Sequence, residues 1–427
     1  MKSYLSLIVC VLSFLWITPV MAAGDLSSDL QSGEFWKKPI QEIGRQFLQG
    51  ERMRWVDESK SVLRLPKSKI CLGEMSLGEI LLSLKDGKPV SMTIMVYNKG
   101  DQGAIDKKEF EEKLKESMDC LTKLSGVEPK PYKVGRGETA VKLQAWSWTW
   151  SQGAISLEAS TSKDGREFEA EFIRLKMGAS TQAITRVSSN ARLEKADLLK
   201  HVKKTGKRVI IEGIPMVDQG EKGYCVVATA SRIFAYYGMN FVDQHELASI
   251  ANSSGDGGTT TSSMAQALKK IGSRFQVRVR DIDGINDLKS YQKFAREYNR
   301  AARREKKEML PDTTHDLGEM WTKVDADVLK AARAGNQGQM DRWMKPVRDY
   351  VSTGVPVLWC VHLGIVPEPV GLFQTRGGHM RMIIGYDDDK KTLIFSDSWG
   401  AEHTAKEMPL QDAISITTSR MALQPGK

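Results

Sequence analysis

The chain has 427 residues, of which 62 are Lys or Arg and 53 are Asp or Glu, so its formal net charge is +9. This length exceeds what a single hydrophobic core usually serves, and two domains are therefore expected. Basic residues are mixed with acidic ones in runs such as residues 303–308, and no basic stripe with interleaved aromatic residues is present, which argues against nucleic-acid binding.

Residues 1–23 have the layout of a secretory signal peptide. Lys2 precedes an apolar run from Leu5 to Ile17, and small residues follow as far as Ala23. The run is too short to span a bilayer and stay there, and no later apolar stretch reaches about 18 residues. We therefore expect a cleaved signal peptide, a secreted or periplasmic protein and no transmembrane span, with a non-cleaved anchor as the alternative.

Residues 24–180 alternate between strand and helix patterns and predict an α+β domain. Apolar residues recur every three or four positions in a charged helix over residues 106–124. In the strand that follows, Trp146, Trp148 and Trp150 occupy alternate positions and so share one face. That face is expected either in the core of the domain or against a partner.

Four cysteines remain once the signal peptide is removed. Cys225 begins a helix that is described below, and Cys360 lies in the apolar run 355–361, where a buried inert thiol is expected. Cys71 and Cys120 are then the candidates for a disulfide, which would stabilise the fold by roughly 4 kcal/mol in an oxidising compartment. Two separately buried thiols are the alternative.

The apolar pattern fades over residues 181–208, which we interpret as a linker. Residues 209–427 form the second predicted domain. Within it, residues 282–350 are helical and highly charged and are interpreted as an insertion. A buried strand at 355–361, followed by alternating strands and turns, completes the chain.

Cys225 is predicted to lie at the start of a buried helix that ends at Gly238. At that position the unpaired backbone amides and the helix dipole stabilise a thiolate, the reactive form of cysteine. Gly220 and Gly223 allow a sharp turn into the helix. Gln219, six residues before Cys225, is placed to direct its side-chain amide at the oxyanion that forms when the thiolate attacks a carbonyl. Taken alone, these residues are also explained by a small core cysteine and an exposed loop glutamine.

His379 and Asp397 flank a predicted hairpin whose turn is centred on Asp388. Antiparallel pairing about this centre makes partner numbers sum to 776, so His379 and Asp397 face each other, with Cβ atoms roughly 4.5–5.5 Å apart. A carboxylate at this distance accepts the ring N–H and fixes the tautomer of the imidazole. A slip of one residue would move one of the two to the other face. The alternative is a surface hairpin in which the two align by chance.

A thiol, a base and a group that orients the base occur in this order along the chain. With them the sequence resembles the papain-like cysteine peptidases, in which a Gln in a Gln-Gly context stands six residues before the nucleophile, as Gln219 does here. The later family motif Asn-Ser-Trp-Gly resembles residues 397–400, with Asp in place of Asn. The resemblance implies a role for each residue of the site: Gln219 helps to form the oxyanion hole, Cys225 attacks, His379 transfers the proton, Asp397 orients His379, and Trp399 shields their hydrogen bond. It implies no metal and no cofactor.

The resemblance is to one branch of these peptidases more than to the others. The run after Cys225 lacks the Trp-Ala-Phe-Ser of the plant and lysosomal enzymes, whereas the Asp partner and residues 248–272 are similar to the bacterial double-glycine, bacteriocin-processing branch. The similarity extends over residues 210–415. It implies a domain in which the nucleophile helix packs on an antiparallel sheet, preceded by a separate strand-rich α+β domain.

These residues together predict an exported cysteine peptidase that hydrolyses peptide bonds in a peptide or protein substrate through an acyl-thioester on Cys225. One alternative uses the same residues to transfer the acyl group to an amine or to cleave a non-peptide amide. Another is a papain-like shell without chemistry that binds a partner on the tryptophan face. Residues 24–180 are expected to be a retained binding domain, because papain propeptides are mainly helical; a propeptide and an envelope anchor are the alternatives.

Overall fold

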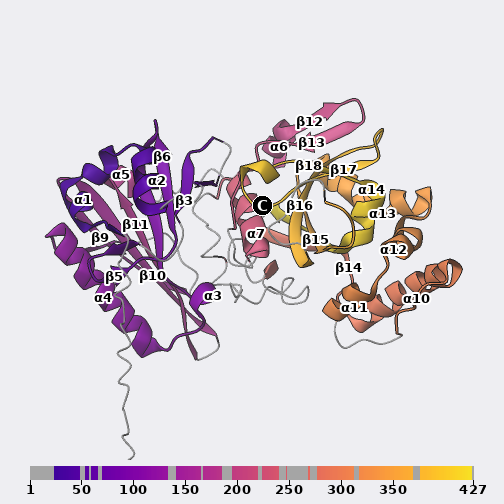
Figure 1. Cartoon of the computed structure of the whole chain (residues 1–427), viewed down its shortest axis with the longest axis horizontal. Coiled ribbons are helices and arrows are strands. Elements are labelled where there is room, and N and C mark those ends of the chain that lie inside the picture. The colour runs from indigo at the N-terminus through magenta and orange to yellow at the C-terminus, as the bar shows by residue number, and fades with distance from the viewer. Residues whose placement is uncertain are drawn as a thin grey trace, which may run out of the picture.

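The computed structural model of the chain describes residues 24–48, 53–56, 59–65, 70–132, 141–164, 167–184, 195–219, 224–239, 247, 268–269, 277–311, 317–368 and 376–425. The expected signal peptide, residues 1–23, lies outside them, as does the family-like segment 248–272 except for residues 268–269. We call the described residues up to 184 the N-terminal part and those from 195 the C-terminal part. The two parts lie next to each other, each built around its own large sheet (Figure 1).

The large sheet of the N-terminal part is antiparallel, with its strands in the order β2-β3-β6-β7-β11-β10-β9-β8. These strands are β2 (Arg54–Trp55), β3 (Val62–Leu65), β6 (Ile80–Lys85), β7 (Lys88–Asn98), β8 (Lys130–Pro131), β9 (Val141–Trp150), β10 (Gly153–Asp164) and β11 (Glu167–Gly178). A small sheet joins β1 (Gly24–Asp25), β4 (Ile70–Leu72) and β5 (Met75–Ser76). The helices are α1 (Ser27–Ser32), η1 (Glu34–Lys37), α2 (Ile40–Leu48), α3 (Lys99–Gln102), α4 (Lys107–Ser125) and α5 (Thr181–Ile184).

Helix α4 begins and ends at residues suited to those positions. The Asp106 side chain accepts a hydrogen bond from the Glu109 amide at 2.9 Å and so caps the first turn. Gly126 follows the last turn with a φ of 69°, a left-handed conformation that glycine adopts without strain. Between these caps the helix buries Phe110 and Leu121 against the sheet.

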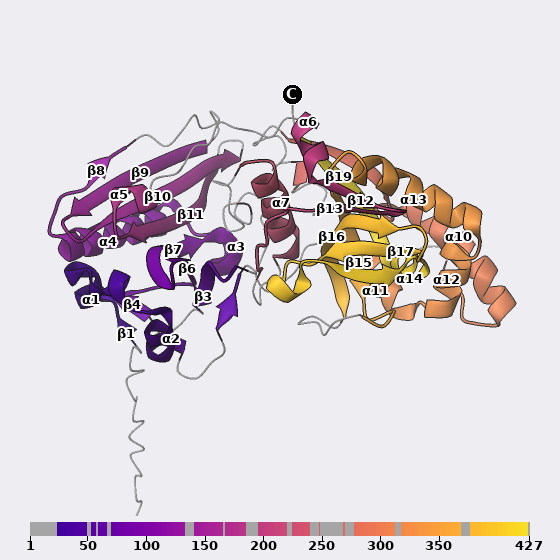
Figure 2. The same cartoon turned by 90° about the horizontal axis from the view of Figure 1, so that it is seen from above.

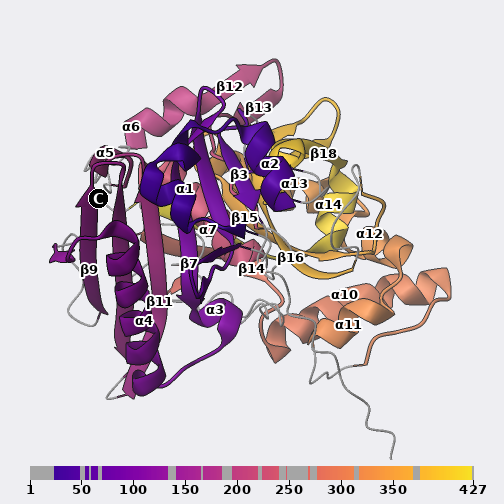
Figure 3. The same ribbon diagram turned by 60° about the vertical axis from the view of Figure 1, so that its left-hand side comes forward.

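Helix α4 also covers the tryptophan row of β9. Trp148 is fully buried, and its indole N–H donates to the Thr122 hydroxyl of α4 at 3.0 Å. Trp146 and Trp150 are half-buried against the same core. In Figure 3, α1 and α4 lie on the side of the sheet that is turned away from the C-terminal part. The row therefore belongs to the core and not to a docking face.

The sheet of the C-terminal part is antiparallel too, with strands in the order β12-β13-β16-β15-β19-β14, while β17 pairs with β16 and β18 with β17. These strands are β12 (Val202–Thr205), β13 (Arg208–Ile211), β14 (Val277–Gly284), β15 (Val357–Leu363), β16 (Gly377–Asp387), β17 (Thr392–Ser396), β18 (Lys406–Pro409) and β19 (Thr417–Pro425). Helix α7 (Cys225–Tyr236) packs against β16 on the side nearer the N-terminal part, and α13 (Gln337–Val351) lies on the opposite side (Figure 2). The chain is thus α+β with large antiparallel sheets, as predicted.

The expected linker, residues 181–208, is structured at both of its ends. Helix α5 packs on β10 and β11, and residues 185–194 lie outside the described range. From residue 195 the chain forms α6 (Lys195–Leu198), η2 (Leu199–His201) and the edge strand β12. The strand β12 was not predicted from the sequence, because it is an exposed edge strand rich in lysine and its apolar pattern is weak. Residues 202–205 of the expected linker thus pair with β13 at the edge of the C-terminal sheet.

The expected insertion, residues 282–350, begins within the last residues of β14, and its described residues form α10 (Leu288–Glu305), α11 (Leu317–Lys323), α12 (Ala326–Ala334) and all but the last residue of α13. The first three of these helices share a small core around Phe294, Tyr298 and Trp321. Helix α13 instead joins the main core through Val347 and Val351. The remaining elements are η3 (Ala401–His403) and α14 (Leu410–Ile416). Among the described residues, no helix has both the length and the apolar character needed to cross a bilayer.

Candidate active site

Cys225 is the first residue of α7 and is buried, at 8% exposure. Burial raises the pKa of its thiol, but a hydrogen bond and charge from His379, together with hydrogen bonds from the backbone of Met380 and Val226, outweigh burial and lower that pKa below its ordinary value. The start of a helix adds unpaired amides and the positive end of the dipole. The environment of Cys225 thus favours the thiolate.

His379 lies on β16 and is buried between three side chains. Its Nε2 lies 2.8 Å from Oδ1 of Asp397, and both side chains are inaccessible to solvent. The Trp399 ring stacks on the imidazole with centroids 4.2 Å apart and planes 12° apart. Burial lowers the pKa of His379, but the hydrogen bonds to Asp397 and Cys225 outweigh it and raise that pKa. Since Asp397 takes Nε2, the other ring nitrogen, Nδ1, is left for the sulfur.

The Cys225 thiol thus interacts with the His379 imidazole, the imidazole is hydrogen-bonded to the Asp397 carboxylate, and all three side chains are buried. The opposite shifts of the first two pKa values favour a proton on the imidazole and a negative charge on the sulfur. The hydrogen bond at Nε2 fixes the orientation of the ring. A thiol whose pKa is lowered beside an imidazole whose pKa is raised has the chemistry needed to attack a carbonyl carbon and to protonate a leaving group.

The contact between His379 and Asp397 arises from a different register than the sequence predicts. Met382 pairs with Ser396, so partner numbers sum to 778 instead of 776, and the predicted direct pairing is wrong. A shift of two residues leaves each side chain on its predicted face, because faces alternate with period two. Asp397 therefore reaches His379 diagonally, and Trp399 lies against the ring.

The register differs because the turn lies further along the chain than predicted. The Asp387 carboxylate accepts hydrogen bonds from the amides of Asp389 at 3.1 Å and Lys390 at 3.0 Å, which starts the turn at Asp387. Lys391, with a φ of 52°, closes it. Next to this turn the partner numbers sum to 779, and a bulge between Ile383 and Gly385 moves the register back by one residue, to 778. Neither feature is visible in the alternation of apolar residues.

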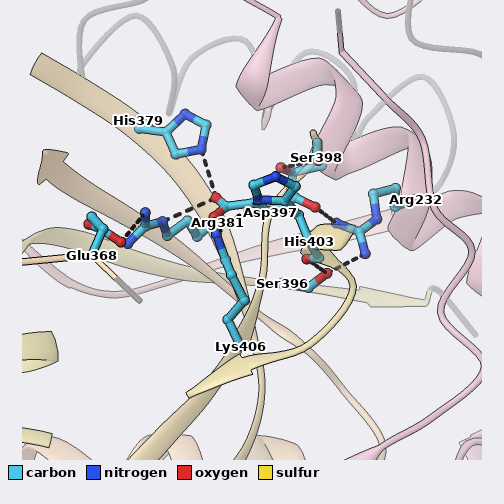
Figure 4. A network of polar contacts seen from close by, with 10 residues as sticks. Arg232, Glu368, His379, Arg381, Ser396, Asp397, Ser398, His403 and Lys406 are labelled. Carbon is cyan, nitrogen blue, oxygen red and sulfur yellow. Dashed lines mark hydrogen bonds and ion pairs between the residues drawn. The ribbon is translucent and has the colours of Figure 1, made fainter. Parts of the chain in front are cut away.

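Asp397 is held by two buried cations that the sequence reasoning did not identify. Arg381 donates from Nε to Oδ1 at 3.1 Å, and the Lys406 ammonium contacts Oδ2 (Figure 4). Burial raises the pKa of Asp397, but the charge of Arg381, then His379, and the charge of Lys406 hold that pKa well below its usual range. Arg381 also pairs with Glu368 at 2.9 Å. Arg381 stands two residues after His379 and so shares its face of β16, which is the signal that could have identified it.

Arg232 ties the nucleophile helix to the segment that carries Asp397. It lies in α7, seven residues after Cys225, and is fully buried. Its guanidinium donates to the backbone carbonyl of Asp397 at 2.9 Å, to the Ser396 hydroxyl at 2.6 Å and to the Pro215 carbonyl at 2.9 Å. The relative position of the thiol and the carboxylate is therefore fixed by backbone contacts as well as by the His379 ring.

Gln219 lies beside the same segment. It is buried, at 4% exposure, and its backbone N–H donates to the Ser398 carbonyl at 2.8 Å. The predicted turn through Gly220 and Gly223 lies outside the described residues. The structure thus brings Gln219 to the residue that follows Asp397, as well as placing Trp399 on His379.

The other cysteines are separate from this site. Cys71 and Cys120 are free thiols: the Cys71 sulfur faces the Gly24 carbonyl at 3.8 Å, and the Cys120 sulfur faces the Leu72 carbonyl at 3.2 Å. The structure therefore has the two separate thiols and not the disulfide. Cys360 is buried in β15, as expected, and burial raises its pKa to about 12.

Comparison with known proteins identifies one family. Residues 211–418, which include Gln219, Cys225, His379 and Asp397, match the model of the Peptidase_C39 like family. Among solved structures, the cysteine protease xylellain from Xylella fastidiosa is 13% identical over 56% of this chain and 91% of its own, with a TM-score of 0.24. No curated protein matches the chain.

Replacing Asp397 with Asn, the residue of the family motif, is expected to lower the free energy of unfolding by about 3–5 kcal/mol at pH 7, because the buried Lys406 loses its carboxylate partner and the buried Arg381 keeps only Glu368. Denaturant unfolding measures this change. The fold lowers the pKa of Asp397, so its contribution is present above the unfolded pKa of about 3.9 and declines as the pH falls toward the folded pKa. The difference in the free energy of unfolding between variant and wild type is therefore expected to become smaller at acidic pH.

The matched control combines Asp397→Asn with Lys406→Met, which removes the cation left without a carboxylate partner and is expected to recover part of the lost stability. An Asp397→Asn variant within about 0.5 kcal/mol of wild type would contradict this reading of the charge cluster.

Proposed function

Residues 211–418 belong to the papain-like cysteine peptidase superfamily, and on this premise we propose that the protein is a cysteine peptidase that hydrolyses peptide bonds with Cys225 as its nucleophile. The observation that supports the proposal is the hydrogen bond between Nε2 of the buried His379 and the Asp397 carboxylate, beside a buried Cys225 whose pKa His379 lowers. This chemistry requires a polypeptide substrate that reaches the sulfur at the start of α7.

In the first half of the reaction, the Cys225 thiolate attacks the carbonyl carbon of the scissile peptide, and the carbonyl oxygen becomes an oxyanion. Gln219 is the side-chain donor proposed for that oxyanion, together with backbone amides at the start of α7. His379 gives its Nδ1 proton to the leaving nitrogen as the C–N bond breaks. An acyl-thioester remains on Cys225, and the amine product leaves.

In the second half, His379 takes a proton from water, and the hydroxide attacks the thioester. The C–S bond breaks, the acid product leaves, and the thiolate returns beside a protonated imidazole. Asp397 keeps the ring oriented throughout. Because Arg381 and Lys406 lower the pKa of Asp397, the carboxylate stays ionised and accepts the Nε2 proton only as a hydrogen bond.

Two observations favour chemistry over a binding shell without activity. The tryptophan face that such a shell would present is covered by α4. The thiol at position 225 has a lowered pKa although it is buried, and a cysteine that only fills space in a core has a raised one, as Cys360 does.

A peptide mixture incubated with the protein is expected to yield new termini, with at least about a thousandfold loss of rate for Cys225→Ala and for His379→Ala, because each removes a reacting group. Mass spectrometry of the products measures this. An added amine distinguishes hydrolysis, which yields free carboxylates, from acyl transfer, which yields amides. Cys120→Ser removes a thiol of the N-terminal part and is the control expected to keep full activity. Cleavage that persists in Cys225→Ala would contradict the proposal.

We also propose that the protein is exported to the periplasm or beyond. The support is the sequence of residues 1–23 alone. The protein purified from its native host is expected to start near Gly24 by N-terminal sequencing, and a chain that still begins at Met1 would contradict cleavage.

A further inference from the structure

The N-terminal part contacts the C-terminal part at residues that are direct neighbours of the proposed active-site residues. Arg64 of β3 binds Asp218, which precedes Gln219. Asn98, the last residue of β7, accepts a hydrogen bond from the Tyr224 hydroxyl at 3.5 Å, and Tyr224 precedes Cys225. In Figures 1 and 2, β3 lies at the edge of the N-terminal part that faces α7.

A third contact involves Gly400. Gly400 follows Trp399, and a Cβ atom at Gly400 would lie 3.3 Å from the Trp55 carbonyl of β2 and 3.9 Å from the Asp218 carboxylate. The backbone of the N-terminal part thus approaches the segment that carries the stacked tryptophan. Gly400 has a φ of 94° and no side chain, so a glycine at this position is what permits the two backbones to lie this close together.

Arg64 makes the most extensive of these contacts. It is 3% exposed, and one guanidinium nitrogen donates to the backbone carbonyl of Asp218. Its Nε lies 3.7 Å from the Asp218 carboxylate, and its remaining terminal nitrogen lies 2.6 Å from the carboxylate of Glu79. A buried arginine that bridges two carboxylates in this way is held in one orientation, because each displacement would leave a charge unpaired.

The carbonyl that Arg64 binds belongs to the peptide group between Asp218 and Gln219. The N–H of that same peptide group donates to the Ser398 carbonyl at 2.8 Å. A peptide group is planar, so fixing its C=O from one side and its N–H from the other fixes the plane and the direction in which Gln219 leaves it. The hydrogen bond to the C=O comes from Arg64 of β3, and the acceptor of the N–H is the carbonyl of the residue after Asp397.

We infer that Arg64 is a positioning residue of the proposed peptidase: it orients Gln219 through the peptide group of residues 218–219, and the N-terminal part is therefore a retained component of the active site. The inference rests on the proposed function. Oxyanion donors act only when they are held in place before the reaction, so a donor on an untethered loop loses most of its effect. Arg64 itself touches no substrate.

The test compares wild type with Arg64→Ala, Gln219→Ala and the double variant, using p-nitrophenyl acetate as an acyl donor that needs no knowledge of the natural substrate. Arg64→Ala is expected to lower kcat by about tenfold to a hundredfold, with KM nearly unchanged. The double variant is expected to be no slower than Gln219→Ala alone, because Arg64 acts through Gln219. A residue that only stabilises the fold would not give this non-additive pattern.

Alkylation of Cys225 by iodoacetamide provides a second readout. This reaction forms no oxyanion, so its rate in Arg64→Ala is expected to stay within about twofold of wild type. Lys38→Met is the matched control: Lys38 is a half-buried cation of the same part, paired with Asp29 at 2.5 Å, and its loss should leave kcat unchanged. If Arg64→Ala fails to fold, the double variant Arg64→Met, Glu79→Gln is used in its place. It removes the cation together with the charge of one of its two carboxylate partners.

The outcomes separate the inference from the function on which it rests. If wild type leaves the ester intact, the proposed function fails. If wild type turns the ester over and Arg64→Ala matches it, or if the losses from Arg64→Ala and Gln219→Ala multiply in the double variant, the role assigned to Arg64 is wrong while the peptidase proposal stands.

Discussion

The buried carboxylate of Asp397 is the charge on which the rest of the site depends. A lone carboxylate at this depth would cost several kcal/mol and would take up a proton instead of staying charged. Arg381 and Lys406 prevent that, and His379 takes the remaining hydrogen bond. The charge that orients the imidazole therefore also neutralises two buried cations, which explains why Asp stands where the family motif has Asn. An amide at this position would leave Lys406 without a carboxylate partner and Arg381 with Glu368 alone.

Two arginines then place the backbone around this charge. Arg232 reaches from the nucleophile helix to the carbonyl of Asp397, and Arg64 reaches from the N-terminal part to the carbonyl of Asp218. Both bind main-chain oxygens, so they constrain where the chain runs and leave the reacting side chains free. Because both are buried, the constraint persists in the absence of substrate. In the proposed peptidase, the thiol, the imidazole and the glutamine would in this way be organised before a substrate carbonyl binds.

The sequence predicts the parts of this arrangement that follow from local patterns. The helix start at Cys225, the shared face of His379 and Asp397 and the buried position of Cys360 all follow from periodicity and from helix-end signals, and the structure has each of them. The register of the hairpin was predicted wrongly because a side-chain-capped turn at Asp387 and a bulge at Ile384 carry no apolar signature. Arg64, Arg232 and Lys406 were missed for another reason: a buried cation is recognised by partners distant in the chain, and a single sequence does not contain them.

The most direct test of the account is the pH dependence of iodoacetamide alkylation, mapped to individual cysteines, in wild type and in His379→Ala. The pKa of Cys225 is lowered, whereas burial raises the pKa values of Cys71, Cys120 and Cys360, so these three serve as internal controls. At mildly acidic pH only Cys225 is expected to react, and His379→Ala is expected to move its reaction to alkaline pH, because only backbone hydrogen bonds then oppose the effect of burial on the pKa of Cys225. Reaction of Cys225 no earlier than the other thiols, and with the same profile in both proteins, would contradict the account.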